Sequence, residues 1–146
     1  MLTQTWALVL LVDDNPDILR TVPALLARVG LETVTADSGP AGLAALEQRI
    51  PNLVLLDNDM PGMRGLRVLH LMKEDVRFRH IPVICISGDA THNFLAEAQR
   101  LGIVGLVPKP FESIDLLRAV LKALGRPPAP EANLQSLVQE HSALGK

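Results

Sequence analysis

The feature that most limits the possible folds is the run of four apolar residues at 53–56, which ends at Asp57. A short run that is apolar at every position is typical of a β-strand buried on both faces, as in a parallel sheet covered by helices. The chain then enters a loop marked by Pro61, Gly62 and Gly65. Open α/β sheets bind ligands in the crevice outside the carboxyl ends of their strands, so Asp57 is the first candidate for chemistry.

Four further runs resemble this one and alternate with helical patterns. The expected strands are residues 7–12, 33–36, 53–56, 82–86 and 103–107. Apolar residues at helical spacing follow each strand, over about 16–29, 40–48, 65–73, 91–101 and 113–124. Asp14 or Asn15 is expected to cap the first helix, Asp37 or Ser38 the second and Ser113 the last. Five alternations with short links predict an α/β fold, a parallel sheet with helices on both faces.

Composition excludes several classes of protein. The 146 residues carry a net charge of −2, which gives no basic footprint for direct binding of nucleic acid. The apolar segment 7–12 is too short to cross a membrane or to serve as a signal peptide, so a cytoplasmic location is the default expectation. Cys85 is the one cysteine and lies in an apolar run, which predicts a buried, inert thiol.

Polar side chains follow four of the predicted strands: Asp13 and Asp14, then Asp57, Ser87 and Lys109. In a parallel sheet these strand ends lie along one edge. Crowded carboxylates repel one another unless a cation lies among them, and oxygen ligands suit Mg²⁺. A hydroxyl and an ammonium group nearby can bind the oxygens of a phosphoryl group. The pattern therefore predicts a magnesium-assisted phosphoryl site with Asp57 as the acceptor.

Four motifs along residues 7–124 together resemble the receiver domains of two-component response regulators. They are an acidic pair after the first strand, an acceptor motif D-x-x-M-P-G-x-x-G, a hydroxyl after the fourth strand and Lys-Pro-Phe after the fifth. In this sequence they are Asp13-Asp14, residues 57–65, Ser87-Gly88 and Lys109-Pro110-Phe111. Each motif is weak alone, but four in this order at compatible spacing make a specific match.

The resemblance implies a signalling domain rather than an enzyme. A sensor histidine kinase or a phosphotransfer protein would donate a phosphoryl group to Asp57. The domain would relay the signal by a conformational change and take part in its own dephosphorylation. The implied fold is flavodoxin-like, a doubly wound five-stranded parallel sheet of order 2-1-3-4-5 with five helices. A cis peptide bond between Lys109 and Pro110 is also expected.

The resemblance further implies a role for each residue of the site. Asp14 and Asp57 would bind Mg²⁺ directly, together with the backbone carbonyl of Asp59. Asp13 would act through a water molecule. The residues expected to bind phosphoryl oxygens are Ser87 and Lys109.

Two positions depart from the family pattern. Receivers usually carry Tyr or Phe three residues before the lysine, whereas this chain has Leu106 and contains no tyrosine. Leucine lacks a polar tip, so we expect phosphorylation to change the face formed by residues 91–101, 103–107 and 113–124 only weakly. A homodimer through this face is a further possibility. The second departure is Asp59, which adds a negative charge beside the phosphoryl site.

Two other functions compete with this interpretation. Asp57 and Asp59 after an apolar strand also match the D-x-D start of haloacid-dehalogenase-like phosphatases, in which they would be nucleophile and general acid. That family places the motif on its first strand, with its metal carboxylates downstream, whereas the acidic pair lies upstream here. The third interpretation is a receiver-like interaction module that is never phosphorylated, against which the complete set of site residues argues.

The domain organisation predicted is a receiver domain over residues 1–125 and a tail over 126–146. The tail opens with Arg126-Pro127-Pro128-Ala129-Pro130, a proline-rich linker that favours an extended conformation. Apolar residues at helical spacing follow over 131–144. This short helical segment is compatible with dimerisation, docking or the start of a further domain.

Overall fold

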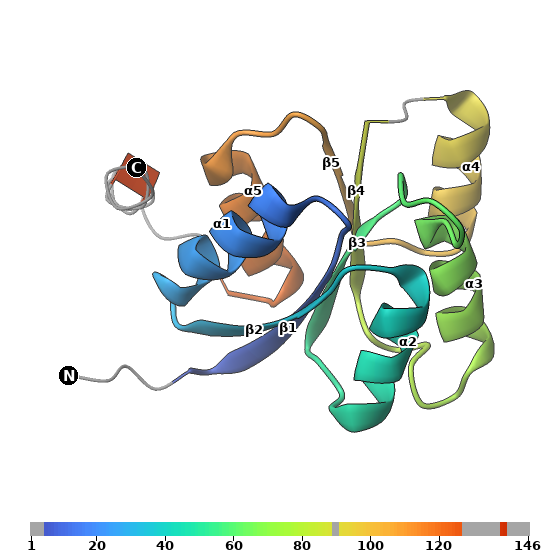
Figure 1. Cartoon of the computed structure of the whole chain (residues 1–146), viewed down its shortest axis with the longest axis horizontal. Coiled ribbons are helices and arrows are strands. Elements are labelled where there is room, and N and C mark those ends of the chain that lie inside the picture. The colour runs from blue at the N-terminus through green and yellow to red at the C-terminus, as the bar shows by residue number, and fades with distance from the viewer. Residues whose placement is uncertain (1–4, 89–90, 127–137, 140–146) are drawn as a thin grey trace.

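Figure 1 shows the computed structural model of the chain, which describes residues 5–88, 91–126 and 138–139. Its central layer is a five-stranded parallel sheet of order β2-β1-β3-β4-β5. The strands are β1 (Ala7–Val12), β2 (Leu31–Ala36), β3 (Leu53–Asp57), β4 (Val83–Ser87) and β5 (Gly105–Pro108). The predicted α/β fold and the strand order implied by the family resemblance are both confirmed.

Five helices cover the two faces of the sheet (Figure 1). They are α1 (Pro16–Ala27), α2 (Gly39–Gln48), α3 (Gly65–Glu74), α4 (His92–Arg100) and α5 (Ser113–Ala123). Helices α1 and α5 pack on one face, and α2, α3 and α4 pack on the other. Every residue of β3 is buried, as its apolar run predicted, because alternate side chains enter the two cores.

The element boundaries differ from the predicted ones in a few places. Strand β2 begins two residues earlier than expected, because Leu31 already pairs with Ala7 of the neighbouring β1. The side chains of Asn15 and Ser38 cap α1 and α2. The predicted cap at Ser113 is wrong: Glu112 is the N-cap of α5, and its side chain makes no capping hydrogen bond.

Cys85 lies on β4 with 2% of its surface exposed. Burial raises the pKa of its thiol to about 12. Because the thiolate is the reactive form, we expect native Cys85 to resist a thiol reagent in mildly alkaline buffer, whereas the urea-unfolded chain reacts fully. Absorbance of the released chromophore measures both rates. Equal rates in native and unfolded protein would contradict the buried position.

Trp6, just before β1, and Arg126, just after α5, lie at the same edge of the sheet. The Trp6 indole N–H donates to the carbonyl of Val29 at 2.8 Å, and the Arg126 guanidinium lies 4.0 Å from the centre of the Trp6 ring. The predicted proline-rich linker lies outside the described residues apart from Arg126. Of the predicted C-terminal helix, the structure describes Val138 and Gln139, which are helical, and Val138 packs against the α1–α5 core.

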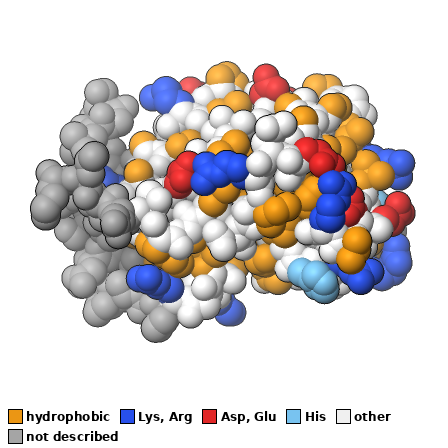
Figure 2. Space-filling view, turned by 90° about the horizontal axis from the view of Figure 1, so that it is seen from below, with side chains coloured by type: hydrophobic (Ala, Val, Ile, Leu, Met, Phe, Trp, Pro, Cys, Tyr) orange, Lys and Arg blue, Asp and Glu red, His pale blue; other side chains and the backbone are white. Residues whose placement is uncertain are grey.

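Charged side chains are mixed in sign over the surface. On the face in Figure 2, basic and acidic groups are interspersed among hydrophobic ones. Ion pairs between exposed side chains include Arg77 with Glu47 and Arg49 with Glu32, each at 2.7 Å. Within the residues described, no helix combines the length and the apolar character needed to cross a membrane.

Candidate functional site

The carboxyl ends of four adjacent strands bring the predicted site residues together. Asp13 follows β1, Asp57 ends β3, Ser87 ends β4 and Lys109 follows β5. Asp13, Asp57 and Ser87 are buried, while the Lys109 side chain is 22% exposed. Asp14 is exposed at the mouth of the site. The sequence-based prediction of one polar cluster at this edge is therefore confirmed.

The Asp57 carboxylate is buried, but only one of its two oxygens accepts a hydrogen bond from the described residues. Its Oδ1 accepts a hydrogen bond from the Asp59 N–H at 2.9 Å and lies 3.4 Å from Lys109 Nζ. Its buried Oδ2 has no hydrogen-bond partner among the described residues. Burial raises the pKa of Asp57 to about 6; the charges of Asp13 and Asp59 act in the same direction, and the Asp59 N–H and Lys109 oppose them.

Lys109 joins the two buried carboxylates. Its Nζ lies 3.1 Å from Asp13 Oδ2, with an orientation that makes this an ion pair rather than a directed hydrogen bond. The other oxygen of Asp13 accepts from the Asn15 N–H at 2.9 Å. Burial disfavours the ammonium, but close contact with Asp13 and Asp57 outweighs it and raises the pKa of Lys109. The lysine is thus held charged beside the acceptor, and its peptide bond to Pro110 is cis, as expected.

The donor atoms of the site fit a hard divalent cation. One carboxylate oxygen from each of Asp13, Asp14 and Asp57 can be chosen so that all lie within 4.8 Å of one another. Oxygen ligands of this kind suit Mg²⁺. The buried Oδ2 of Asp13, which has no directed hydrogen bond among the described residues, is a polar atom that such an ion would satisfy.

Asp59 lies in an arrangement that sequence reasoning missed. Its Oδ2 accepts a hydrogen bond from the Gly88 N–H at 2.8 Å, and Ser87 Oγ lies 3.3 Å from both carboxylate oxygens. Arg64 Nη2 lies 3.9 Å from its Oδ1. The sequence revealed an extra charge near Asp57, but no pattern within one strand and loop indicates that this charge reaches across to β4.

Asn58 was also missed as a part of the site. It is 1% exposed, and its side-chain oxygen accepts from the Leu66 N–H at 2.9 Å, which ties the loop after β3 to the start of α3. A Cβ on Gly65 would meet the backbone of Asp57 and would lie 2.9 Å from Asn58 Cα. The glycine therefore allows α3 to begin directly against the acceptor strand.

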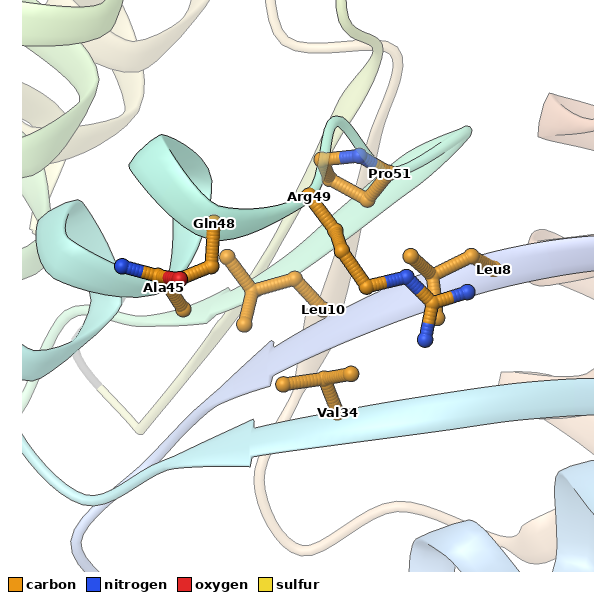
Figure 3. Close-up of a pocket in the computed structure, with 7 residues that line it drawn as sticks. All are labelled: Leu8, Leu10, Val34, Ala45, Gln48, Arg49 and Pro51. Atoms are coloured by element: carbon orange, nitrogen blue, oxygen red, sulfur yellow. The ribbon is translucent and has the colours of Figure 1, made fainter.

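An apolar cavity of about 200 Å³ lies away from this site, between β1, β2 and α2. Its lining residues are Leu8, Leu10, Val34, Ala45, Gln48, Arg49 and Pro51 (Figure 3). Arg49, the charged residue of this lining, pairs with Glu32. The cavity contains none of the residues predicted to carry chemistry, so we place the functional site at the polar edge.

The face around β5 presents apolar side chains to solvent. Val104 is 55% and Leu106 38% exposed. They lie beside Ala119, Lys122 and Ala123 of α5 around a shallow hollow. Leu106 is thus at the surface in this structure, on the face where the sequence analysis expected a weak response.

Comparisons with known proteins agree with this fold. The family model for the response regulator receiver domain matches residues 9–121. The chain is 32% identical over 119 residues to the chemotaxis protein CheY of Pseudomonas aeruginosa, covering 81% of this chain and 96% of CheY. It is 36% identical over 126 residues to the response regulator protein FleR of that organism, covering 86% of this chain and 26% of FleR. The crystal structure of CheY4 of Vibrio cholerae matches with a TM-score of 0.76 and 25% identity, covering 82% of this chain and 99% of CheY4.

Proposed function

Because the chain belongs to the response regulator receiver family, we propose that it accepts a phosphoryl group on Asp57 from a histidine kinase or a phosphotransfer protein. The domain would relay the signal by a conformational change in the cytoplasm. The observation that carries the proposal is the Oδ2 of the buried Asp57, which has no hydrogen-bond partner in the part of the chain that the structure describes, with Lys109 held 3.4 Å from the other oxygen. A buried carboxylate with one oxygen held and the other available is a positioned nucleophile.

The proposed reaction forms one bond and breaks one. Asp57 Oδ2 attacks the phosphorus of a phosphohistidine, and a P–O bond forms as the P–N bond breaks. The electron pair of that bond returns to the imidazole nitrogen, which leaves as neutral imidazole because the other ring nitrogen carries a proton. Lys109 supplies positive charge to the phosphoryl oxygens, and Ser87 donates a hydrogen bond to them.

Asp13, Asp14 and Asp57 are the residues that would hold Mg²⁺, with the backbone carbonyl of Asp59 as a further ligand. When bound, the ion supplies positive charge that offsets the repulsion between the carboxylates and the incoming phosphoryl oxygens. The domain would also lose the group by hydrolysis. Water attacks phosphorus, the P–O bond to Asp57 breaks, and the products are inorganic phosphate and the Asp57 carboxylate.

A homodimer through the face of α4, β5 and α5 is a second part of the proposal. The exposed side chains of Val104 and Leu106 support it, because adjacent apolar surface gains free energy when a second copy removes it from water. Since Leu106 has no polar tip, we expect phosphorylation to change the affinity of this face only weakly.

The test of the proposed function locates the phosphoryl group directly. The protein is incubated with acetyl phosphate and Mg²⁺, and intact mass is expected to show one added phosphoryl group. Borohydride reduction, which converts an aspartyl phosphate to homoserine, is expected to mark Asp57 in the peptide map. Incubation with excess chelator is the control and is expected to prevent the label. Homoserine at another aspartate, or no label at all, would contradict the proposal.

A further inference from the structure

Asp59 holds the Ser87 hydroxyl, which the proposed function assigns to the phosphoryl oxygens, and the neighbouring Gly88 N–H. We infer that its carboxylate is a built-in competitor, which holds Ser87 and Gly88 in the resting protein and must leave before the phosphoryl oxygens can bind there. This inference rests on the proposed function, because the competition exists only if Asp57 accepts a phosphoryl group. It assigns Asp59 as a positioning residue that sets how readily the site is filled.

The hydrogen bonds support competition rather than simple proximity. The Gly88 N–H donates to Asp59 Oδ2 at 2.8 Å, a distance typical of a charge-assisted hydrogen bond. Ser87 Oγ, at 3.3 Å from both carboxylate oxygens, makes a longer and weaker contact. A hydroxyl has one proton to donate and a backbone amide has one, so neither group can serve Asp59 and a phosphoryl oxygen fully at once.

The position of Asp59 lets its side chain leave without disrupting the core. The side chain is 34% exposed, and its Oδ1 already lies 3.9 Å from the guanidinium of Arg64, which is 59% exposed. Its backbone N–H stays on Asp57 Oδ1 at 2.9 Å, so rotation of the side chain alone can release Ser87 and Gly88. After it leaves these donors, the Asp59 carboxylate can therefore be solvated by water and paired with the Arg64 guanidinium.

The experiment measures affinity for beryllium fluoride, which binds a carboxylate and copies a tetrahedral phosphoryl group. Titrations in saturating Mg²⁺ compare the parent with Asp59→Ala. We expect about tenfold tighter binding by the variant, equivalent to about 1.4 kcal/mol. Asp59→Asn keeps the shape but not the charge, and it is expected to give a smaller gain in the same direction. Asp37→Asn removes an exposed charge after β2 and is expected to change nothing.

Two further measurements separate competition from general charge repulsion. In a Ser87→Ala background the gain from Asp59→Ala is expected to shrink, because one of the contested donors is gone. The Gly88 amide resonance is expected to move when Asp59→Ala is introduced into the metal-free protein. An equal gain in both backgrounds, an unmoved Gly88 resonance, or no gain from Asp59→Ala would each overturn the inference.

The same titrations distinguish this inference from the proposed function. If neither the parent nor Asp59→Ala binds beryllium fluoride more tightly than Asp57→Asn does, the proposed acceptor is wrong. If the parent binds through Asp57 and Asp59→Ala binds no better, only the role of Asp59 is wrong.

Discussion

Asp57→Asn is expected to remove phosphoryl acceptance completely. The amide has nearly the shape of the carboxylate and can keep the hydrogen bond from the Asp59 N–H, but it lacks the nucleophilic oxygen anion. Intact mass after incubation with acetyl phosphate and Mg²⁺ measures the loss. Lys109→Met, which leaves the acceptor in place, is the comparison and is expected to reduce labelling without abolishing it. Full labelling of Asp57→Asn would contradict the assignment of the acceptor.

The same substitution is expected to stabilise the protein in metal-free buffer. Burial raises the pKa of Asp57 to about 6 from an ordinary value of 3.8, so folding penalises its ionised form. Below about pH 3 the group is protonated in both the folded and unfolded states and the penalty is absent. The penalty grows as the pH rises between the two pKa values and is constant above about pH 7, at up to about 3 kcal/mol.

Urea unfolding of the parent and Asp57→Asn, with chelator present, measures this difference as a function of pH. The free energy of unfolding of the variant is expected to exceed that of the parent by an amount that rises from about pH 4 and levels off above about pH 7. Asp37→Asn, which removes an exposed carboxylate, is the matched control and is expected to show no such rise. A variant less stable than the parent at neutral pH would show that Asp57 is not under electrostatic strain.

Gly65→Ala is expected to destabilise the protein by about 3 kcal/mol, at the upper end of the usual cost of overpacking. The added Cβ would meet the carbonyl oxygen of Asp57 and lie 2.9 Å from Asn58 Cα. Both neighbours are backbone atoms next to the acceptor, and backbone cannot move aside as the end of a flexible side chain can. We also expect slower labelling of Asp57, because relief of the clash displaces the loop.

Gly105→Ala is the matched control for this substitution. Its added Cβ would lie 3.4 Å from a side-chain atom of Ile84, which is ordinary contact. We therefore expect a change of no more than about 0.5 kcal/mol in the free energy of unfolding. Urea denaturation of both variants makes the comparison, and equal stabilities would mean that the chain after β3 can relax at little cost.

The sheet and the members of the site could be predicted because each depends on a local pattern. Leu53–Asp57 reads as a buried strand from its own composition, and a polar residue after such a strand must lie at the carboxyl edge. Parallel pairing then brings Asp13, Asp57, Ser87 and Lys109 together without further information. Their identities and their order along the chain were enough to indicate the family.

The direction in which a loop side chain points could not be predicted in the same way. Asp59 reaches Gly88 across 29 positions of sequence, and Asn58 holds Leu66 across eight. Both contacts depend on the path of the loop after β3, which follows from packing against Gly65 rather than from any repeat. The predicted N-cap of α5 was wrong for a related reason. Ser113 has a side-chain hydroxyl that could cap a helix, but the N-cap position falls one residue earlier, at Glu112.

The contact between Trp6 and Arg126 has a consequence for how the domain could be joined to other proteins. It places Trp6, just before β1, and Arg126, just after α5, at the amino edge of the sheet, opposite Asp57. A six-residue strand spans about 20 Å, so both residues lie roughly that far from the acceptor. A protein that bound at this edge would therefore leave the mouth of the site open to a donor protein. Helix α5 joins this edge to the edge that holds the site, since it begins four residues after Lys109 and ends three residues before Arg126.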